Sequence, residues 1–292
     1  MDVLTIGNFD GVHLGHRRLV ERARELAGPG GRVTAVTFEP LPAAVLRPGT
    51  PIERLTDAQA RRRLLREAGC DEVLELNPRD GLLALEPAAF VVRLRESTPF
   101  AAVVEGRDFR FGAGRAGDVG TLRDLGRSMG FEVEEVADLS IGLADAVMTP
   151  VRSTTIRWLL AMGRVADAAR LLGRPHAVVG PVREGDRRGR TLGFPTANVD
   201  PGETMLPADG VYAADAIVDG RRHRAAVSVG TKPTFGGAGR TCEAHVVGLP
   251  KAIGEYGWTL ELRFTSWLRS QWRFPGPEAL VAQLRRDVCR LG

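Results

Sequence analysis

Apolar positions in the first half of the chain alternate between the spacing of short buried strands and that of amphipathic helices. The run at 3–6 predicts a strand, and from His16 apolar residues recur at helical spacing up to the glycines near 28–31. Thr56, with Gln59 three residues later, resembles a capping box that opens a helix over 61–68. The other predicted strands are 32–38, 72–76, 101–105 and 131–136, and the other predicted helices are 87–96, 119–129, 153–162 and 165–172. Such alternation indicates an α/β domain with a mostly parallel sheet.

The apolar runs in the second half are shorter, and glycine and proline separate them. They predict antiparallel strands, as in a small β-barrel, at 178–182, 210–218, 225–229, 243–247 and 258–264. One helix at about 277–291 ends the chain, with its apolar residues on one face. The pattern changes near Gly173-Arg174-Pro175, so we expect one domain over 1–173 and a second over 174–292.

Composition fits two ordinary globular domains, since 43% of the 292 residues are hydrophobic and 26% are charged. The net charge is only +4, and arginine supplies nearly all of the positive side chains. Arginine suits anionic small molecules, but it also suits a solvated surface. The bias is too weak to indicate DNA binding, so we expect no nucleic acid among the partners.

The chain shows no signal for a membrane or a secreted location. No apolar run reaches the roughly 18 residues that a spanning helix needs, and the first residues lack the pattern of a signal peptide. We therefore expect a cytoplasmic protein with no membrane partner. Cys70, Cys242 and Cys289 are far apart and no CxxC occurs, so we expect neither a thiolate metal site nor a disulfide framework.

Residues 5–16 read Thr-Ile-Gly-Asn-Phe-Asp-Gly-Val-His-Leu-Gly-His, which takes a strand through a glycine-containing loop into a helix that should begin near His16. Loop amides and a helix N-terminus favour anions, and His13 and His16 can donate hydrogen bonds to phosphate oxygens. No Walker A motif occurs, so this loop is the candidate phosphate site. The loop residues that we expect to contact the nucleotide are Gly7, Asn8, Phe9, Asp10 and Gly15.

A second polar cluster lies late in the same half. Ser153 and Thr154 stand where a helix should begin, and Arg157 follows one turn later. Their hydroxyls, the N-terminal amides and the guanidinium can converge on phosphate. By itself Ser-Thr is simply a good helix N-cap. Together with the two histidines, the cluster becomes a candidate second half of the phosphate site.

These motifs make the first half resemble the nucleotidylyltransferase superfamily, which has a Rossmann-like parallel sheet. More closely, 5–16, 37–40, 106–112 and Gly117-Asp118 resemble the adenylyltransferase module of the prokaryotic bifunctional riboflavin kinase/FAD synthetase family. The resemblance implies that FMN phosphate attacks the α-phosphorus of ATP, giving FAD and pyrophosphate with Mg²⁺ and without a covalent enzyme intermediate. It also implies catalytic roles for His13, His16 and Arg157. The implied flavin-binding residues are Asp108, Phe109 and Arg110.

The second half has its own glycine-rich motif at 180–198. Its glycines, Gly185 among them, let the backbone fold tightly around a ligand. Thr196 and Asn198 offer hard oxygen atoms two residues apart, which suit Mg²⁺ bridged to nucleotide phosphate. By chemistry alone, an arginine-rich turn followed by a Pro-Thr-Ala-Asn turn explains the motif equally well.

The same stretch resembles the riboflavin kinase signature from Gly189 to Asn198, and the motifs at 207–212, 233–235 and Glu243-x-His245 follow in the family's order. The resemblance implies nucleotide-binding roles for Gly185, Thr196 and Asn198, with the last two as metal ligands. It makes Glu243 the base that takes the proton of the ribityl 5′-hydroxyl, a task that suits a carboxylate. The implied small-molecule partners are riboflavin, FMN, FAD and ATP as co-substrate.

Three positions depart from the family's pattern. Leu41 replaces a usual histidine, Arg152 a usual serine, and Ser228 a usual asparagine. They put reaction rates, or the preferred flavin or nucleotide, in question. The chain is therefore interpreted as a bifunctional flavin-cofactor enzyme, with two alternatives: a paralogue with one activity, and a non-catalytic flavin- or nucleotide-binding protein. The sequence does not determine the oligomeric state.

Overall fold

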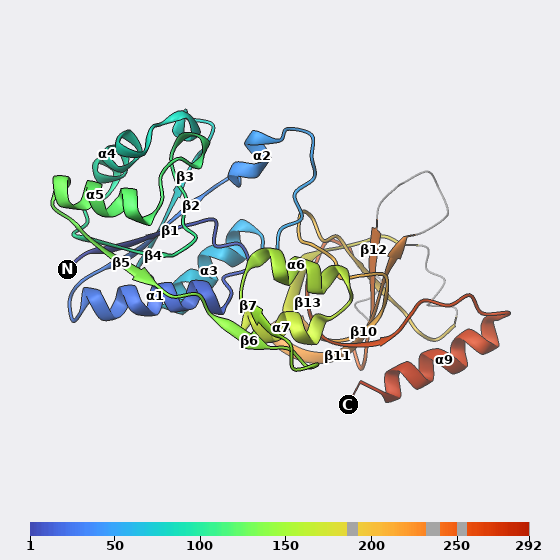
Figure 1. Cartoon of the computed structure of the whole chain (residues 1–292). Coiled ribbons are helices and arrows are strands. Elements are labelled where there is room, and N and C mark those ends of the chain that lie inside the picture. The colour runs from blue at the N-terminus through green and yellow to red at the C-terminus, as the bar shows by residue number, and fades with distance from the viewer. Residues whose placement is uncertain (186–191, 232–239, 250–255, 292) are drawn as a thin grey trace. The chain divides into compact units, whose positions relative to one another are not determined.

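The computed structural model describes residues 1–185, 192–231, 240–249 and 256–291. The chain forms two compact units, and each is described by itself (Figure 1). The first unit comprises Met1–Ile52, Asp57–Ile141 and Met148–Arg152. The second comprises Glu53–Thr56, Gly142–Val147 and the chain from Ser153 onward.

The first unit is built on a five-stranded parallel sheet in the order β3-β2-β1-β4-β5. Its strands are β1 (Val3–Ile6), β2 (Val33–Phe38), β3 (Glu72–Leu76), β4 (Ala102–Gly106) and β5 (Glu132–Val136). The strand order reverses between β1 and β4, so the loops that follow these two strands lie at the topological switch point. In open α/β sheets, ligands bind at that edge.

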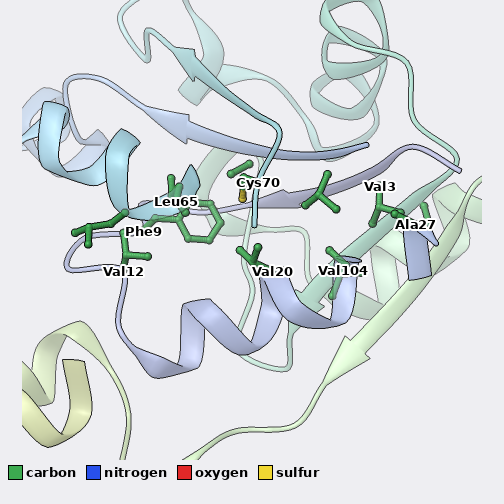
Figure 2. Close-up of a cluster of buried hydrophobic side chains, with 13 residues drawn as sticks. Val3, Phe9, Val12, Val20, Ala27, Leu65, Cys70 and Val104 are labelled. Atoms are coloured by element: carbon green, nitrogen blue, oxygen red, sulfur yellow. The ribbon is translucent and has the colours of Figure 1, made fainter. Parts of the chain in front are cut away.

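Helices cover both faces of this sheet (Figure 1). They are α1 (Leu14–Ala27) and α3 (Ala58–Ala68) on one face, and α4 (Pro87–Ser97) and α5 (Val119–Met129) on the other. The unit also contains α2 (Pro42–Leu46), which has no buried residue, and the 3₁₀ turns η1 (Leu82–Ala84) and η2 (Ala113–Arg115). Val3 packs in one core with α1 and α3 (Figure 2), whereas Leu4 packs in a second core with α4 and α5. Burial on both faces explains why these strands are continuous apolar runs in the sequence.

The second unit contains a closed antiparallel barrel in the order β10-β11-β12-β9-β8-β13. Its strands are β8 (His176–Arg183), β9 (Ala197–Val199), β10 (Gly210–Val218), β11 (Arg221–Thr231), β12 (Arg240–Val246) and β13 (Thr259–Arg269). Helices α6 (Ser153–Ala161) and α7 (Val165–Leu172) precede the barrel, and α9 (Pro277–Cys289) follows it. A separate two-stranded sheet joins β6 (Ser140–Gly142) and β7 (Met148–Pro150), and all of it except Gly142 belongs to the first unit.

Both flanking helices pack on the barrel. Helix α7 lies against β13 and β8, and α9 lies against β11. Asp287 of α9 is fully buried, and it is held by a bidentate ion pair with Arg269, whose Nη2 lies 2.7 Å from Asp287 Oδ2. This pair joins α9 to the end of β13.

The predicted fold class is confirmed: a Rossmann-like parallel sheet is followed by a small antiparallel barrel and a C-terminal helix. Two helix starts were predicted wrongly. Helix α1 begins at Leu14 instead of near His16, because the His13 side chain serves as its N-cap. Helix α3 is capped by Asp57 instead of Thr56, because the Asp57 carboxylate accepts a 2.7 Å bond from the Ala60 amide. The pattern also missed α2, β6, β7 and β9, which have five residues or fewer.

Candidate active sites

The loop between β1 and α1 has an unusual backbone. Phe9, Gly11 and Val12 have φ angles of +46°, +84° and +37°, a region that side-chain-bearing residues rarely occupy. Phe9 and Val12 are nevertheless buried in the core, close to Leu65 of α3 (Figure 2). Burial of these two side chains offsets the strain, and such strain concentrates at functional sites.

The two predicted histidines lie together at the start of α1. Their rings are stacked, with centroids 3.5 Å apart and planes inclined by 14°. His13 Nδ1 accepts a 3.3 Å hydrogen bond from the His16 amide. A neutral His13 therefore carries its proton on Nε2, where it can be donated to a ligand. A helix N-terminus adds positive potential at the same place.

Gly15 leaves room for this packing. A Cβ there would lie 3.2 Å from the His13 ring and 3.2 Å from the carbonyl oxygen of Val151. The Phe9 ring packs edge-on against the His16 ring, with the ring centroids 5.1 Å apart. The structure thus places Phe9, His13, Gly15 and His16 together at the start of α1. Their predicted roles in catalysis and nucleotide binding stay predictions.

The remaining residues of the loop divide into an exposed and a buried group. Asn8 is exposed and can reach a ligand, whereas Asp10 is only 2% exposed. Gly7 continues the hydrogen bonding between β1 and β2, since its amide donates a 2.9 Å bond to the Val36 carbonyl oxygen. Their predicted nucleotide contacts stay predictions.

The predicted flavin-binding residues follow β4, the strand beside β1. Phe109 stacks on Phe111 with centroids 5.4 Å apart. The Asp108 carboxylate lies 3.6 Å from Arg152, which also pairs with Asp138 at 2.9 Å. Arg152, one of the departures from the family pattern, therefore ties the loop after β4 to the segment after β5. The loops with the histidines and with Asp108, Phe109 and Arg110 meet at the switch point, although flavin binding itself stays a prediction.

Glu105, the penultimate residue of β4, was missed by the sequence analysis. Its carboxyl is buried and accepts a hydrogen bond from the Ile6 amide at the end of β1. Burial raises the pKa of this carboxyl well above its usual value. A charged residue that ends an apolar run gives no local signal of such a position.

Ser153 opens α6, and Arg157 Nε donates a 3.0 Å hydrogen bond to the Glu53 carbonyl oxygen. Ser153, Thr154 and Arg157 belong to the second compact unit, whereas the histidines belong to the first. Their predicted convergence on one phosphate stays a prediction.

In the barrel, a polar row crosses four adjacent strands. Glu243 of β12 pairs in register with Asn198 of β9 on one side and with Ser228 of β11 on the other. Asn198 pairs in turn with Arg183 of β8. The neighbours of Glu243 along its strand, Cys242 and Ala244, are buried inside the barrel, so Glu243 faces outward. Laterally paired residues lie about 4.5–5.5 Å apart on one face, so the four side chains can act on one ligand.

Close contacts surround residues of this row. A Cβ on Gly185 would come within 1.9 Å of Asn198 Nδ2, so a larger residue there would displace the Asn198 side chain or the turn after β8. Ser228 Oγ accepts a 3.1 Å bond from Gln271. His245, on the same face as Glu243, has its Nδ1 2.9 Å from the Pro195 carbonyl oxygen. The motif residues Gly189, Arg190 and 233–235 lie outside the described residues.

Nothing in the described ranges forms a cluster of three or more His, Cys, Asp or Glu side chains that could hold a metal by itself. The donors near the row are instead the Thr196 hydroxyl, the Asn198 amide and the Glu243 carboxylate, which suit a hard cation shared with phosphate. Burial raises the pKa of the Cys70 and Cys242 thiols to about 12, so neither thiol is a ready ligand or nucleophile.

Comparison with known proteins decides the family. A family model for FAD synthetase matches residues 1–148, and one for riboflavin kinase matches residues 172–291. The chain is 37% identical over 290 residues to a bifunctional riboflavin kinase/FMN adenylyltransferase of Escherichia coli, covering 98% of this chain and 90% of that protein. A Listeria monocytogenes protein of the same name is 34% identical, with the same coverage. The chain belongs to the bifunctional riboflavin kinase/FMN adenylyltransferase family.

A solved structure shares the fold of this chain. The crystal structure titled "Macrolide-efflux Protein from Streptococcus pneumoniae" matches with a TM-score of 0.88 and 29% identity, over 98% of this chain and 92% of that one. Its title describes that protein alone. Within the described part of this chain, no helix is both long enough and apolar enough to cross a membrane.

Proposed function

We propose that this chain makes both flavin cofactors from riboflavin. It phosphorylates riboflavin with ATP to FMN, and it transfers AMP from ATP to FMN, giving FAD and pyrophosphate. The observation that carries the proposal is that two family models, FAD synthetase and riboflavin kinase, match in succession on one chain. We further propose that the enzyme works in the cytoplasm, the compartment that holds its co-substrate ATP.

The first unit supplies adenylyl transfer. A phosphate oxygen of FMN attacks the α-phosphorus of ATP, and the bond from that phosphorus to pyrophosphate breaks. The role of the protein is to position the reactants and to stabilise charge on the phosphoryl oxygens. His13 and His16 donate hydrogen bonds to these oxygens beside the N-terminus of α1. The family resemblance gives Ser153, Thr154 and Arg157 a role in binding phosphate in the same reaction. The loop with Asp108, Phe109 and Arg110 binds the flavin.

The barrel supplies the kinase. The ribityl 5′-hydroxyl oxygen of riboflavin attacks the γ-phosphorus of ATP, the bond to the β-phosphate breaks, and ADP leaves. Glu243 accepts the hydroxyl proton. Asn198, beside Glu243 in the polar row, binds the nucleotide together with Thr196 and the turn at Gly185.

Mg²⁺ fits the kinase site as the cation that accompanies ATP. Thr196 and Asn198 would hold it together with phosphate oxygens, since their donor atoms are hard oxygens. When bound, the cation neutralises charge that develops on the transferred phosphoryl group. Both activities should vanish in EDTA and return with Mg²⁺.

The experiment that tests the proposal incubates the full chain with riboflavin, ATP and Mg²⁺, and separates the flavins by chromatography. FMN followed by FAD is the expected result. His16→Ala should stop FAD formation from supplied FMN, with a loss of about 10²–10³-fold, while riboflavin phosphorylation persists. Equal loss of both activities would contradict the assignment of the histidines to one reaction.

The same assay separates the alternatives. A single product, formed only from its own substrate, would indicate an enzyme with one activity, weakened at Leu41, Arg152 or Ser228. If the chain forms product from a modified flavin or another nucleotide, but not from riboflavin and ATP, its substrate differs from the one proposed. Flavin binding without turnover would indicate a binding protein.

We also propose that the two activities can be separated by cutting the chain at residue 173. Within the second unit, however, α7 packs against β13 and β8. A fragment of 174–292 exposes that face of the barrel, so it should unfold at a lower temperature than a fragment that begins at residue 142. Both should phosphorylate riboflavin. If only the longer fragment is active, the functional boundary lies before α6.

A further inference from the structure

Arg61 of α3 is an arginine inside the core of the first unit. Its side chain is 1% exposed and is the largest of the fully buried side chains in the described residues. Nη2 donates to Glu39 Oε2 at 2.9 Å and lies 3.5 Å from Glu75 Oε1. Two carboxylates thus compensate a charge that would otherwise be very costly to bury.

Such a buried ion pair is weak support for stability, because apolar residues of similar volume often serve as well. What an apolar side chain cannot do is donate hydrogen bonds. Arg61 donates from Nη2 to the Phe38 carbonyl oxygen at 3.0 Å, and from Nη1 to the Asn8 carbonyl oxygen at 3.3 Å. The planar guanidinium therefore joins the end of β2 to the loop that carries the histidines.

The Asn8 carbonyl oxygen accepts two hydrogen bonds that hold that loop. Besides the bond from Arg61, it accepts a 3.3 Å bond from Thr37 Oγ1, so two donors hold one peptide plane. This peptide precedes Phe9, whose φ of +46° is unusual for a residue with a side chain. Its orientation determines where the Phe9 ring lies, and that ring packs edge-on against His16.

We infer that Arg61 is a positioning residue for adenylyl transfer: its guanidinium fixes the Asn8–Phe9 peptide and, through the Phe9 ring, the place of His16. The inference rests on the proposed role of His13 and His16. A misplacement of about 1 Å in a reacting constellation can cost about 10²-fold in rate. Arg61 can therefore govern turnover without touching the substrate.

The neighbouring arginine provides a matched control. Arg62 bonds the other oxygen of Glu75, with Nη1 2.7 Å from Oε2, and its side chain is 39% exposed. Arg62→Met removes an arginine from the same helix and from the same carboxylate, yet it leaves both bonds to the Asn8 carbonyl in place.

The first test compares Arg61→Met, Arg61→Lys and Arg62→Met in the full chain. For Arg61→Met we expect kcat for FAD formation from FMN to fall at least tenfold, with KM for ATP within about threefold and riboflavin phosphorylation within about twofold. Arg61→Lys keeps the charge and part of the donor capacity, so it should recover part of the loss. Arg62→Met should match the parent. A folded Arg61→Met protein with parental kcat would overturn the inference.

A second variant decides the matter if Arg61→Met does not fold. Thr37→Val keeps shape and charge but removes the other donor to the Asn8 carbonyl. It should lower kcat for FAD formation several-fold and shift the imidazole Cε1–H resonances of His13 and His16, assigned among the five histidines by single substitutions. Parental kcat and unshifted resonances in Thr37→Val would reject the mechanism.

The two failures remain distinguishable through His16→Ala. If His16→Ala is inactive in FAD formation while folded Arg61→Met and Thr37→Val are fully active, the histidine assignment stands and the positioning role is wrong. If His16→Ala retains parental activity, the proposed function of the histidines is wrong.

Discussion

The histidine loop after β1 and the polar row of the barrel hold their side chains by different means. In the loop, Phe9 and Val12 occupy positive φ outside any ladder, and buried side chains keep them there. In the barrel, Glu243 and its neighbours stand in regular strands, and interstrand hydrogen bonds fix their spacing. The geometry of a site on a strained loop depends on buried residues that do not touch the ligand. The activity of a site on regular strands depends mainly on the residues that touch the ligand.

The barrel half of this comparison is tested most sharply by Glu243→Gln. The substitution keeps the shape but removes most of the basicity, so kcat for riboflavin phosphorylation should fall about 10²–10⁴-fold. The KM for riboflavin should change little, and FAD formation from supplied FMN should persist. Steady-state kinetics of both reactions measure this. Parental phosphorylation would reject Glu243 as base, and a large loss in His245→Gln would then identify the second candidate on the same strand face.

Gly185→Ala tests how closely the ladder site is packed. The new Cβ would lie 1.9 Å from Asn198 Nδ2, so either Asn198 or the turn must move. We expect KM for MgATP in the kinase reaction to rise about tenfold, while adenylyl transfer stays at the parental rate. Gly276→Ala is the control, because its Cβ meets nothing within 4 Å. An unchanged KM in Gly185→Ala would show that Asn198 does not contact the nucleotide.

Gly15→Ala tests how closely the histidine loop is packed, and its new Cβ lies farther from its neighbours than the Cβ of Gly185→Ala. The new Cβ would press on the His13 ring and the Val151 carbonyl, both at 3.2 Å. Separation of the stacked imidazoles should lower kcat for FAD formation a few-fold to about tenfold, with riboflavin phosphorylation unchanged. Gly120→Ala on α5 is a matched control, since its Cβ also meets one atom at 3.2 Å, the Asp118 carboxylate. If both variants behave like the parent, the histidine pair tolerates displacement and the loop is less sensitive than we infer.

The sequence predicted most of the longer helices and strands, because burial on one or two faces of an element gives its apolar residues a regular spacing along the chain. It could not predict the polar row, since Asn198, Ser228 and Glu243 meet only through the register of strands far apart in the chain. Arg61 stands among three consecutive arginines and looks like a surface residue until the fold buries it. The start of α1 was misplaced because histidine is not among the usual N-caps.

The smallest expected effect concerns the pH dependence of stability, which should differ between the two units. Burial raises the pKa of Glu105 well above its usual value, so between the unfolded pKa of about 4.3 and the folded pKa the native state holds a proton that the unfolded state has lost. Stability contributed by this group is therefore full below about pH 4.3 and falls as pH rises. Glu105→Gln cannot ionise and can still accept the Ile6 amide bond, so it should gain stability relative to the parent from pH 5 to pH 8.

Spectroscopy can assign that gain to one unit. All four tryptophans lie at or beyond residue 158, in the second unit, so tryptophan fluorescence follows the barrel unit, whereas far-UV circular dichroism follows both. In urea unfolding of the full chain, Glu105→Gln should shift the circular dichroism midpoint at pH 8 more than at pH 5 and leave the fluorescence midpoint unchanged. Glu72→Gln, an exposed position on β3, makes the same change of charge and should shift neither. Parallel pH profiles for Glu105→Gln and the parent would mean that Glu105 is charged in the native protein, and the edge between β1 and β4 would then be wetter than its packing indicates.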